Sequence, residues 1–139
     1  MIDQFHTIAF THRNLELNEI GMLHIEPSYQ EERLLHLKST LELDELMFLS
    51  TCNRVEFLFC TKKEADFNFF VSFFETLYPN FSREQIGHYA HRGDQFKGIM
   101  AVEHMLAVAS SIDSMVVGER EIITQVRNAF ESSKAMKLT

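Results

Sequence analysis

The sequence predicts an α+β fold in which a four-stranded antiparallel sheet carries two helices on one face. Short segments rich in β-branched and aromatic residues alternate with longer segments whose apolar residues recur every three or four positions, as in strands and amphipathic helices. Two of the short segments are separated by just three residues, Cys52 to Arg54, a spacing typical of a hairpin. The length of 139 residues fits one ordinary domain, so we expect one core within about residues 1–110.

Four strands are expected. The first is Phe5 to Thr11, and the two that flank the hairpin are Leu46 to Thr51 and Val55 to Thr61. We expect the fourth at His88 to Arg92. With helices after the first and third strands, this order matches the ferredoxin-like plan, a split β-α-β arrangement written βαββαβ.

Two helices are expected between the strands. Ser28, with Glu31 three residues later, has the sequence of a capping box and predicts a helix to about Ser39, whereas residues 12–27 are expected to be irregular. The second helix is expected from Glu64 to Tyr78, where apolar residues recur at helical spacing. The expected buried stripes are Leu34, Leu37 and Leu41 on the first helix, and Phe67, Phe70, Val71, Phe74, Leu77 and Tyr78 on the second.

Additional helices are expected toward the carboxyl terminus. One begins at Asp94 and runs to about Ser110. Another follows Gly118 and has an apolar stripe between Ile122 and Phe130. We interpret residues 118–137 as the start of a long helix that links this domain to a following one.

Charge and composition narrow the possible functions. The chain has 13 basic and 20 acidic residues, a formal net charge of -7, so it is a poor general binder of nucleic acid and any RNA contact would be local. Its two cysteines lack the spacing of a zinc site or a disulfide framework, and we expect no metal. The sequence has neither a long uncharged apolar segment nor a signal peptide, which predicts a soluble, cytoplasmic protein without a membrane partner.

Cys52 is the first candidate for chemistry. It follows an apolar strand, so its side chain can face a cleft, and Arg54 brings a positive charge that favours the nucleophilic thiolate. Asn53 tolerates the left-handed backbone that such a bend often needs. The alternative is that Cys52 is a small buried apolar residue, the interpretation that we favour for Cys60 inside its strand.

His104 and the segment 113–122 are the other candidates. His104 stands between apolar neighbours on an expected helix, where a histidine is usually a packed core residue. It can act as a general acid or base if this helix lies beside the 50–56 bend. The segment 113–122 precedes the last helix, whose free N–H groups favour an anion such as a carboxylate. The alternative is that Glu119 and Glu121 are themselves the acidic residues that stabilise the first turn of this helix, with no bound ligand.

Three blocks occur in order: Ser-Thr-Cys-Asn-Arg-Val-Glu at 50–56, Ala-Val-Glu-His-Met-Leu at 101–106, and Ile-Asp-Ser-Met-Val-Val-Gly-Glu through Gln-Val-Arg at 112–127. Together they closely resemble the glutamyl-tRNA reductase family. Thr-His-Arg at 11–13 also resembles the family's Asn-His-Lys element after the first strand. The resemblance extends over essentially the whole chain, and the cysteine block is its most specific part.

The resemblance implies a two-step reduction of glutamyl-tRNA to glutamate-1-semialdehyde, the precursor of tetrapyrroles such as porphyrin and haem. Cys52 would attack the ester carbonyl of the glutamate, release the tRNA and leave a thioester, which NADPH would reduce. A polarisable thiolate is a good nucleophile for an activated ester, and a thioester accepts hydride more readily than a carboxylate.

NADPH has no recognisable site in the sequence. The chain contains no Gly-x-Gly-x-x-Gly element, and the resemblance places the NADPH-binding domain beyond Thr139. We therefore expect the isolated chain to lack reductase turnover and to show at most slow hydrolysis of the ester through Cys52.

Site residues follow from the resemblance, position by position. Cys52 and His104 are the expected catalytic residues, and Arg54 is suited to a bidentate contact with the glutamate carboxylate. The other substrate-binding residues are expected to be Thr51, Asn53, Ser114, Glu119, Arg120, Glu121 and Gln125.

The chain departs from the family pattern at four positions. Glu121 stands where Gln is common, Arg120 where Pro is common, Ser111 where Gly is usual, and Ala107 where a basic residue is common. A carboxylate at position 121 would repel the glutamate carboxylate unless an arginine screens it. The alanine at position 107 removes one possible phosphate contact.

The resemblance also implies partners. It predicts a homodimer formed through a carboxy-terminal region beyond this chain, a monomeric state for the chain itself, and association with the aminotransferase that takes the aldehyde. Two other functions fit the residues: a noncatalytic module that binds aminoacylated tRNA or a protein, and a thiol hydrolase with His104 as its base. Slow, ordinary alkylation of Cys52 would favour the noncatalytic module.

Overall fold

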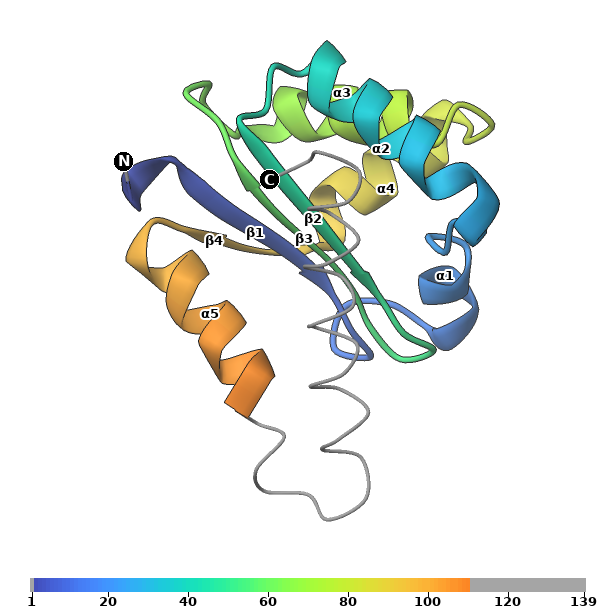
Figure 1. Ribbon diagram of the computed structural model, residues 1–139. Coiled ribbons are helices and arrows are strands. Elements are labelled where there is room, and N and C mark those ends of the chain that lie inside the picture. The colour runs from blue at the N-terminus through green and yellow to red at the C-terminus, as the bar shows by residue number, and fades with distance from the viewer. Residues whose placement is uncertain (1, 111–139) are drawn as a thin grey trace.

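The strands form one antiparallel sheet (Figure 1). In the computed structural model, which describes residues 2–110, the strands are β1 (Phe5–Phe10), β2 (Glu45–Ser50), β3 (Val55–Cys60) and β4 (Asp94–Lys97). Their order across the sheet is β2-β3-β1-β4, and every neighbouring pair is antiparallel. The predicted α+β class is confirmed, and the first three strands lie within one residue of their predicted bounds.

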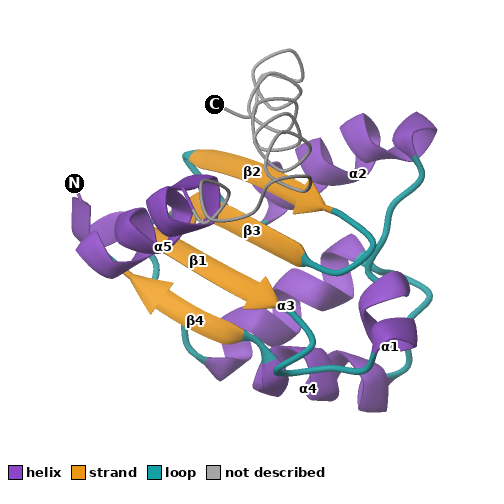
Figure 2. Cartoon of the chain, turned by 90° about the horizontal axis from the view of Figure 1, so that it is seen from below, coloured by secondary structure: helices purple, strands orange, loops and turns teal. Residues whose placement is uncertain are grey.

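Helices lie on both faces of the sheet (Figure 2). They are the 3-10 helix η1 (Ile2–Gln4) and the α-helices α1 (Leu17–Gly21), α2 (Pro27–Thr40), α3 (Phe67–Leu77), α4 (Arg83–Arg92) and α5 (Ile99–Ser110). Residues of α1 to α4 share one core with the sheet, whereas α5 packs on β1 and β4 from the opposite face. Among the described helices, none combines the length and the apolar character needed to span a bilayer.

The segment between residues 83 and 97 differs from the prediction. The predicted strand His88 to Arg92 is the second half of α4, which begins with a capping box between Ser82 and Gln85. The fourth strand is β4, inside the predicted helix from Asp94 to Ser110. That helix begins only after Gly98, whose φ of 65° suits glycine and breaks the helical path.

The two helices before β2 also differ in detail. α1 lies within the segment 12–27 that is predicted to be irregular, and it begins with a capping box formed by Glu16 and Glu19. α2 begins at Pro27, directly after its N-cap residue Glu26, so the predicted cap at Ser28 is wrong. Proline suits this first position because the N–H that it lacks would have no helical partner. The predicted stripe of α2 is buried, at Leu34, Leu37 and Leu41.

The core between the sheet and the helices is largely aromatic. Phe57 of β3 meets Phe73 and Phe74 of α3 edge-on, with ring centroids 5.1 and 6.2 Å apart. The predicted stripe of α3 is wrong at Phe67, which is 52% exposed, and it omits the fully buried Phe73. The helix is therefore rotated relative to the prediction, because its phenylalanines are dense enough to fit more than one stripe.

Contacts with α4 hold α1 in place beside the ends of β1 and β2. His88 Nε2 lies 2.6 Å from Glu19 Oε2, and the Tyr89 hydroxyl donates to the Glu19 carbonyl oxygen at 2.8 Å. The Glu16 peptide N–H and then His88 lower the pKa of Glu19, and burial raises the pKa of Tyr89 to about 12. These contacts fix the segment from which the loops near the candidate site extend.

Gly93, between α4 and β4, lies so close to β1 that a side chain cannot fit. A Cβ there would lie 2.5 Å from Ile8 Cγ1 and 2.9 Å from Phe10 Cζ. We expect Gly93→Ala to lower the free energy of unfolding by about 1–3 kcal/mol through overpacking, as measured by urea denaturation. Gly87→Ala is the matched control, because a Cβ there meets nothing within 4 Å, and this helical position should gain about 0.5–1 kcal/mol. Equal effects of the two variants would contradict the predicted close packing.

Candidate functional site

Cys52 lies at the tip of the tight hairpin that joins β2 to β3. The Thr51 N–H donates to the Arg54 carbonyl oxygen at 2.8 Å, which leaves Cys52 and Asn53 as the two residues of the loop. The Asn53 N–H donates to Thr51 Oγ1 at 3.2 Å. Cys52 is exposed, as the sequence predicts. Asn53 does not use the left-handed backbone that it tolerates, since Glu42 is the only non-glycine residue with positive φ within residues 2–110.

Glu56 is a buried carboxylate directly behind this hairpin. It sits in the middle of the sheet, paired with Ala9 of β1 and Leu49 of β2, and its side chain is 1% exposed. Its Oε2 lies 3.2 Å from Arg54 Nη1, and its Oε1 lies 2.5 Å from His104 Nε2. A buried carboxylate needs such partners, because an isolated charge in an apolar interior is strongly unfavourable. Glu56 therefore links the hairpin to α5.

One oxygen of Glu56 keeps unused hydrogen-bonding capacity. The contact of Oε2 with Arg54 is an ion pair without hydrogen-bond alignment, and no donor among the described residues bonds to this buried oxygen. Arg54 has a side chain that is 34% exposed. Since a guanidinium has five N–H donors, Arg54 can pair with Glu56 and still offer donors to a ligand carboxylate beside Cys52.

His104 is held on two sides. Its ring stacks on Phe96 of β4, with centroids 4.2 Å apart and planes inclined by 12°, and its Nε2 meets Glu56. The Thr7 hydroxyl donates to the Ala101 carbonyl oxygen at 3.5 Å, which adds a contact between α5 and β1. The side chain of His104 thus reaches Glu56, the last residue of the 50–56 segment, while α5 itself packs on β1 and β4. Within residues 2–110, no hydrogen bond joins His104 to Cys52, so the acid–base role stays a prediction.

Sequence reasoning missed Glu56 as a site residue. The available signal was a single acid inside the apolar strand Val-Glu-Phe-Leu-Phe-Cys, on the same strand face as Leu58 and Cys60. Cys60 itself is 6% exposed, and burial raises the pKa of its thiol, so the predicted packing role is confirmed. The predicted site residues Ser114, Glu119, Arg120, Glu121 and Gln125, like the predicted helix 118–137, lie outside the described residues.

Two further loops lie at the same end of the sheet as the hairpin. The loop after β1 turns at Thr11, whose carbonyl oxygen accepts from the Asn14 N–H at 3.0 Å. The loop between α1 and α2 carries His24, whose Nδ1 lies 3.5 Å from Ser50 Oγ at the end of β2. Together with the hairpin, these loops bring three chain segments that are distant in sequence to the end of the sheet that carries Cys52.

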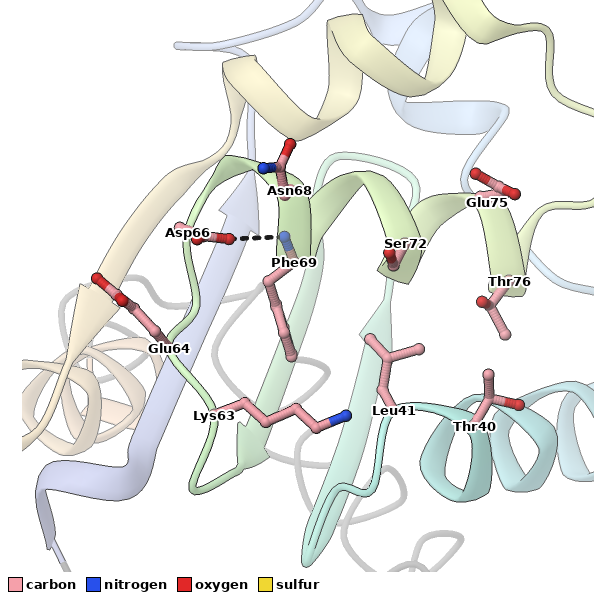
Figure 3. A pocket seen from close by; sticks show the side chains of 10 residues that line it. All are labelled: Thr40, Leu41, Lys63, Glu64, Asp66, Asn68, Phe69, Ser72, Glu75 and Thr76. Atoms are coloured by element: carbon pink, nitrogen blue, oxygen red, sulfur yellow. Dashed lines mark hydrogen bonds between the residues drawn. The ribbon is translucent and has the colours of Figure 1, made fainter.

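One described cavity lies away from Cys52. It has a volume of about 490 Å³ and opens between α2 and α3 near the far end of β3, with Lys63, Asp66 and Thr40 among its lining residues (Figure 3). Asp66 is engaged in capping α3, where it accepts from the Phe69 N–H at 2.8 Å. Of the predicted site residues within residues 2–110, none lines this cavity. Among the described residues, no group of three His, Cys, Asp or Glu side chains could hold a metal ion.

The described geometry is that of an α+β domain that presents an exposed cysteine on the hairpin between two strands of an antiparallel sheet. Comparison with known proteins identifies the family to which this domain belongs. Residues 8–139 match the family model described as glutamyl-tRNAGlu reductase, N-terminal domain, and the chain belongs to this family.

Curated relatives agree with this assignment. The chain is 35% identical over 125 residues to the glutamyl-tRNA reductase of Campylobacter curvus, an alignment that covers 89% of this chain and 28% of that protein. It is 42% identical over 106 residues to that of Syntrophobacter fumaroxidans, which covers 75% of this chain and 22% of that protein. The chain thus spans roughly a quarter of the length of these relatives.

A solved structure supports the fold. The glutamyl-tRNA reductase from Methanopyrus kandleri superposes with a TM-score of 0.68 at 24% identity, over 99% of this chain and 30% of that one. At this identity, the similarity shows a shared fold.

Proposed function

We propose that this domain performs the acyl-transfer step of a glutamyl-tRNA reductase. The Cys52 thiolate attacks the ester carbonyl of glutamate on its tRNA, a carbon–sulfur bond forms, and the carbon–oxygen bond to the ribose breaks. The ribose oxygen leaves and takes up a proton, and glutamate remains as a thioester on Cys52. The observation that carries this proposal is the exposed Cys52 at the hairpin tip, backed by Arg54 and the Glu56–His104 pair.

The surrounding residues would have distinct roles. Arg54 would hold the glutamate side-chain carboxylate with N–H donors that Glu56 leaves free. Thr51 and Asn53 shape the loop and would line the substrate, with Ser114, Glu119, Arg120, Glu121 and Gln125 completing the pocket. His104 would position groups or transfer a proton, with Glu56 holding its ring.

NADPH does not fit the described part of the chain. Dinucleotides bind at a glycine-rich turn between a strand and a helix of a parallel sheet. The sheet within residues 2–110 is antiparallel throughout, and its described glycines, Gly21, Gly87, Gly93 and Gly98, form no such element. We therefore assign acyl transfer to this domain and infer that a separate domain of the enzyme binds NADPH.

The complete enzyme would work in the cytoplasm as an oxidoreductase of tetrapyrrole synthesis. The resemblance supports a homodimer joined outside this domain, with glutamyl-tRNA as substrate and the aldehyde-consuming aminotransferase as partner. Glutamate-1-semialdehyde would be the product.

The test is to mix the chain with tRNA that carries radiolabelled glutamate, without NADPH. We expect label to appear on the protein at up to about one glutamate per chain, in a bond that hydroxylamine cleaves, together with release of free tRNA. Binding of the charged tRNA without any labelled protein would instead favour the noncatalytic module. Rapid, repeated ester hydrolysis would favour the thiol hydrolase.

A further inference from the structure

The three loops around Cys52 differ in charge from the rest of the chain. They comprise residues 11–14, 22–25 and 50–54, and together they contain two arginines and two histidines but no acidic residue. The whole chain has 20 acidic and 13 basic residues. Three acids flank these loops. Glu16 and Glu26 are the N-cap residues of α1 and α2, where a negative charge is favourable, and Glu56 pairs with Arg54. Arg13 is therefore the arginine of these loops that has no carboxylate partner among the described residues.

The sheet register brings these loops together. Phe10 of β1, Val55 of β3 and Ser50 of β2 lie side by side across the sheet, so the chain leaves β1 at Thr11 next to Arg54. The contact of His24 with Ser50 brings the third loop to the same edge. Figure 1 shows the loop after β1, the β2–β3 hairpin and α1 at one end of the molecule.

The loop after β1 is pre-organised. The Arg13 N–H donates to Thr11 Oγ1 at 3.3 Å, and the Thr11 N–H donates to Asn14 Oδ1 at 3.1 Å. These bonds fix the backbone while the side chains of His12 and Arg13 are exposed. Among the described residues, Arg13 has no ion-pair partner, so its guanidinium can bind an anion without first breaking a contact.

We propose that Arg13, with the exposed side chains of His12 and His24 as further hydrogen-bonding groups, forms a rim that binds phosphates of the single-stranded 3′ end of the aminoacylated RNA. This inference rests on the proposed function, in which the ester at Cys52 is attached to that 3′ end. Phosphates of the last nucleotides must then lie within a few ångströms of the hairpin, and arginine binds phosphate through paired N–H donors. The release of counterions makes such contacts favourable even on an acidic protein.

The test compares Arg13→Gln with Lys62→Gln, which removes the same charge from an exposed residue beyond the opposite end of β3. The affinity of each variant and of the unmodified chain for glutamyl-tRNA is measured from about 50 to 200 mM salt. We expect Arg13→Gln to weaken binding by about three- to tenfold at low salt and to reduce the log–log salt slope by about 0.7, the value for one single-strand phosphate. Lys62→Gln should stay within about twofold of the unmodified chain.

The possible outcomes distinguish a failure of the rim proposal from a failure of the proposed acyl transfer. Equal affinity and slope for both variants, or no measurable binding to the unmodified chain, would overturn the rim. If the unmodified chain binds glutamyl-tRNA with the predicted Arg13 dependence but never forms a thioester, the proposed function fails and the rim stands. Urea unfolding midpoints of both variants, compared with the unmodified chain, exclude a folding defect as the cause.

Discussion

Cys52→Ala is expected to lower the rate of glutamate transfer from tRNA to the protein by at least about a thousandfold. The described part of the chain offers no second exposed thiol to replace the nucleophile. The measurement is the appearance of hydroxylamine-sensitive label on the protein in a single turnover. Binding of glutamyl-tRNA should change little, because the thiol contributes to bond formation and hardly to affinity.

The matched control is Cys60→Ala, which removes the other thiol from a buried position of β3. We expect it to retain labelling and to lose roughly 1 kcal/mol of stability through the small cavity that it leaves. Labelling that persists in Cys52→Ala and vanishes in Cys60→Ala would show that Cys60, and not Cys52, carries the glutamate.

Glu56→Ala is expected to lower the free energy of unfolding more than Gly93→Ala or Cys60→Ala does. It leaves His104 and Arg54 without their shared carboxylate, and breaking a buried ion pair from one side is strongly destabilising. Because both partners are partly exposed, we expect a loss of about 2–4 kcal/mol in the free energy of unfolding, as measured by urea denaturation. Acyl transfer should fall as well, since Arg54 and the His104 ring lose their fixed positions.

Two variants give this prediction its controls. Glu56→Gln retains an acceptor for His104 and should be less destabilising than Glu56→Ala. Glu45→Ala removes an equal charge from the exposed start of β2 and should lie within about 0.5 kcal/mol of the unmodified chain. Similar stabilities of Glu45→Ala and Glu56→Ala would show that the Glu56 contacts contribute nothing.

Local pattern predicts the first three strands because each combines aromatic or β-branched residues with clear ends. It fails at β4, since Asp-Gln-Phe-Lys has no apolar alternation and becomes a strand only through pairing with β1. The segment His88 to Arg92 fails for the opposite reason: its short sequence fits a strand, but the cap at Ser82 starts a helix that continues through it.

In the candidate site too, the neighbouring sequence predicts some features, whereas others depend on contacts between residues that are distant in sequence. Exposure of Cys52 follows from its place directly after an apolar strand, which a local pattern contains. The role of Glu56 depends on Arg54 beside it and on His104, 48 residues away on a helix that packs against the other face of the sheet. Only the folded arrangement shows that this acid has two basic partners.

Exposure of the hairpin tip would have a kinetic consequence for the proposed thioester. Because Cys52 is exposed, an acyl group on this thiol would be open to water as well as to the next reactant. The yield of the pathway then depends on how quickly the next reaction partner arrives, relative to spontaneous hydrolysis. The proposed intermediate would therefore have to react onward soon after it forms.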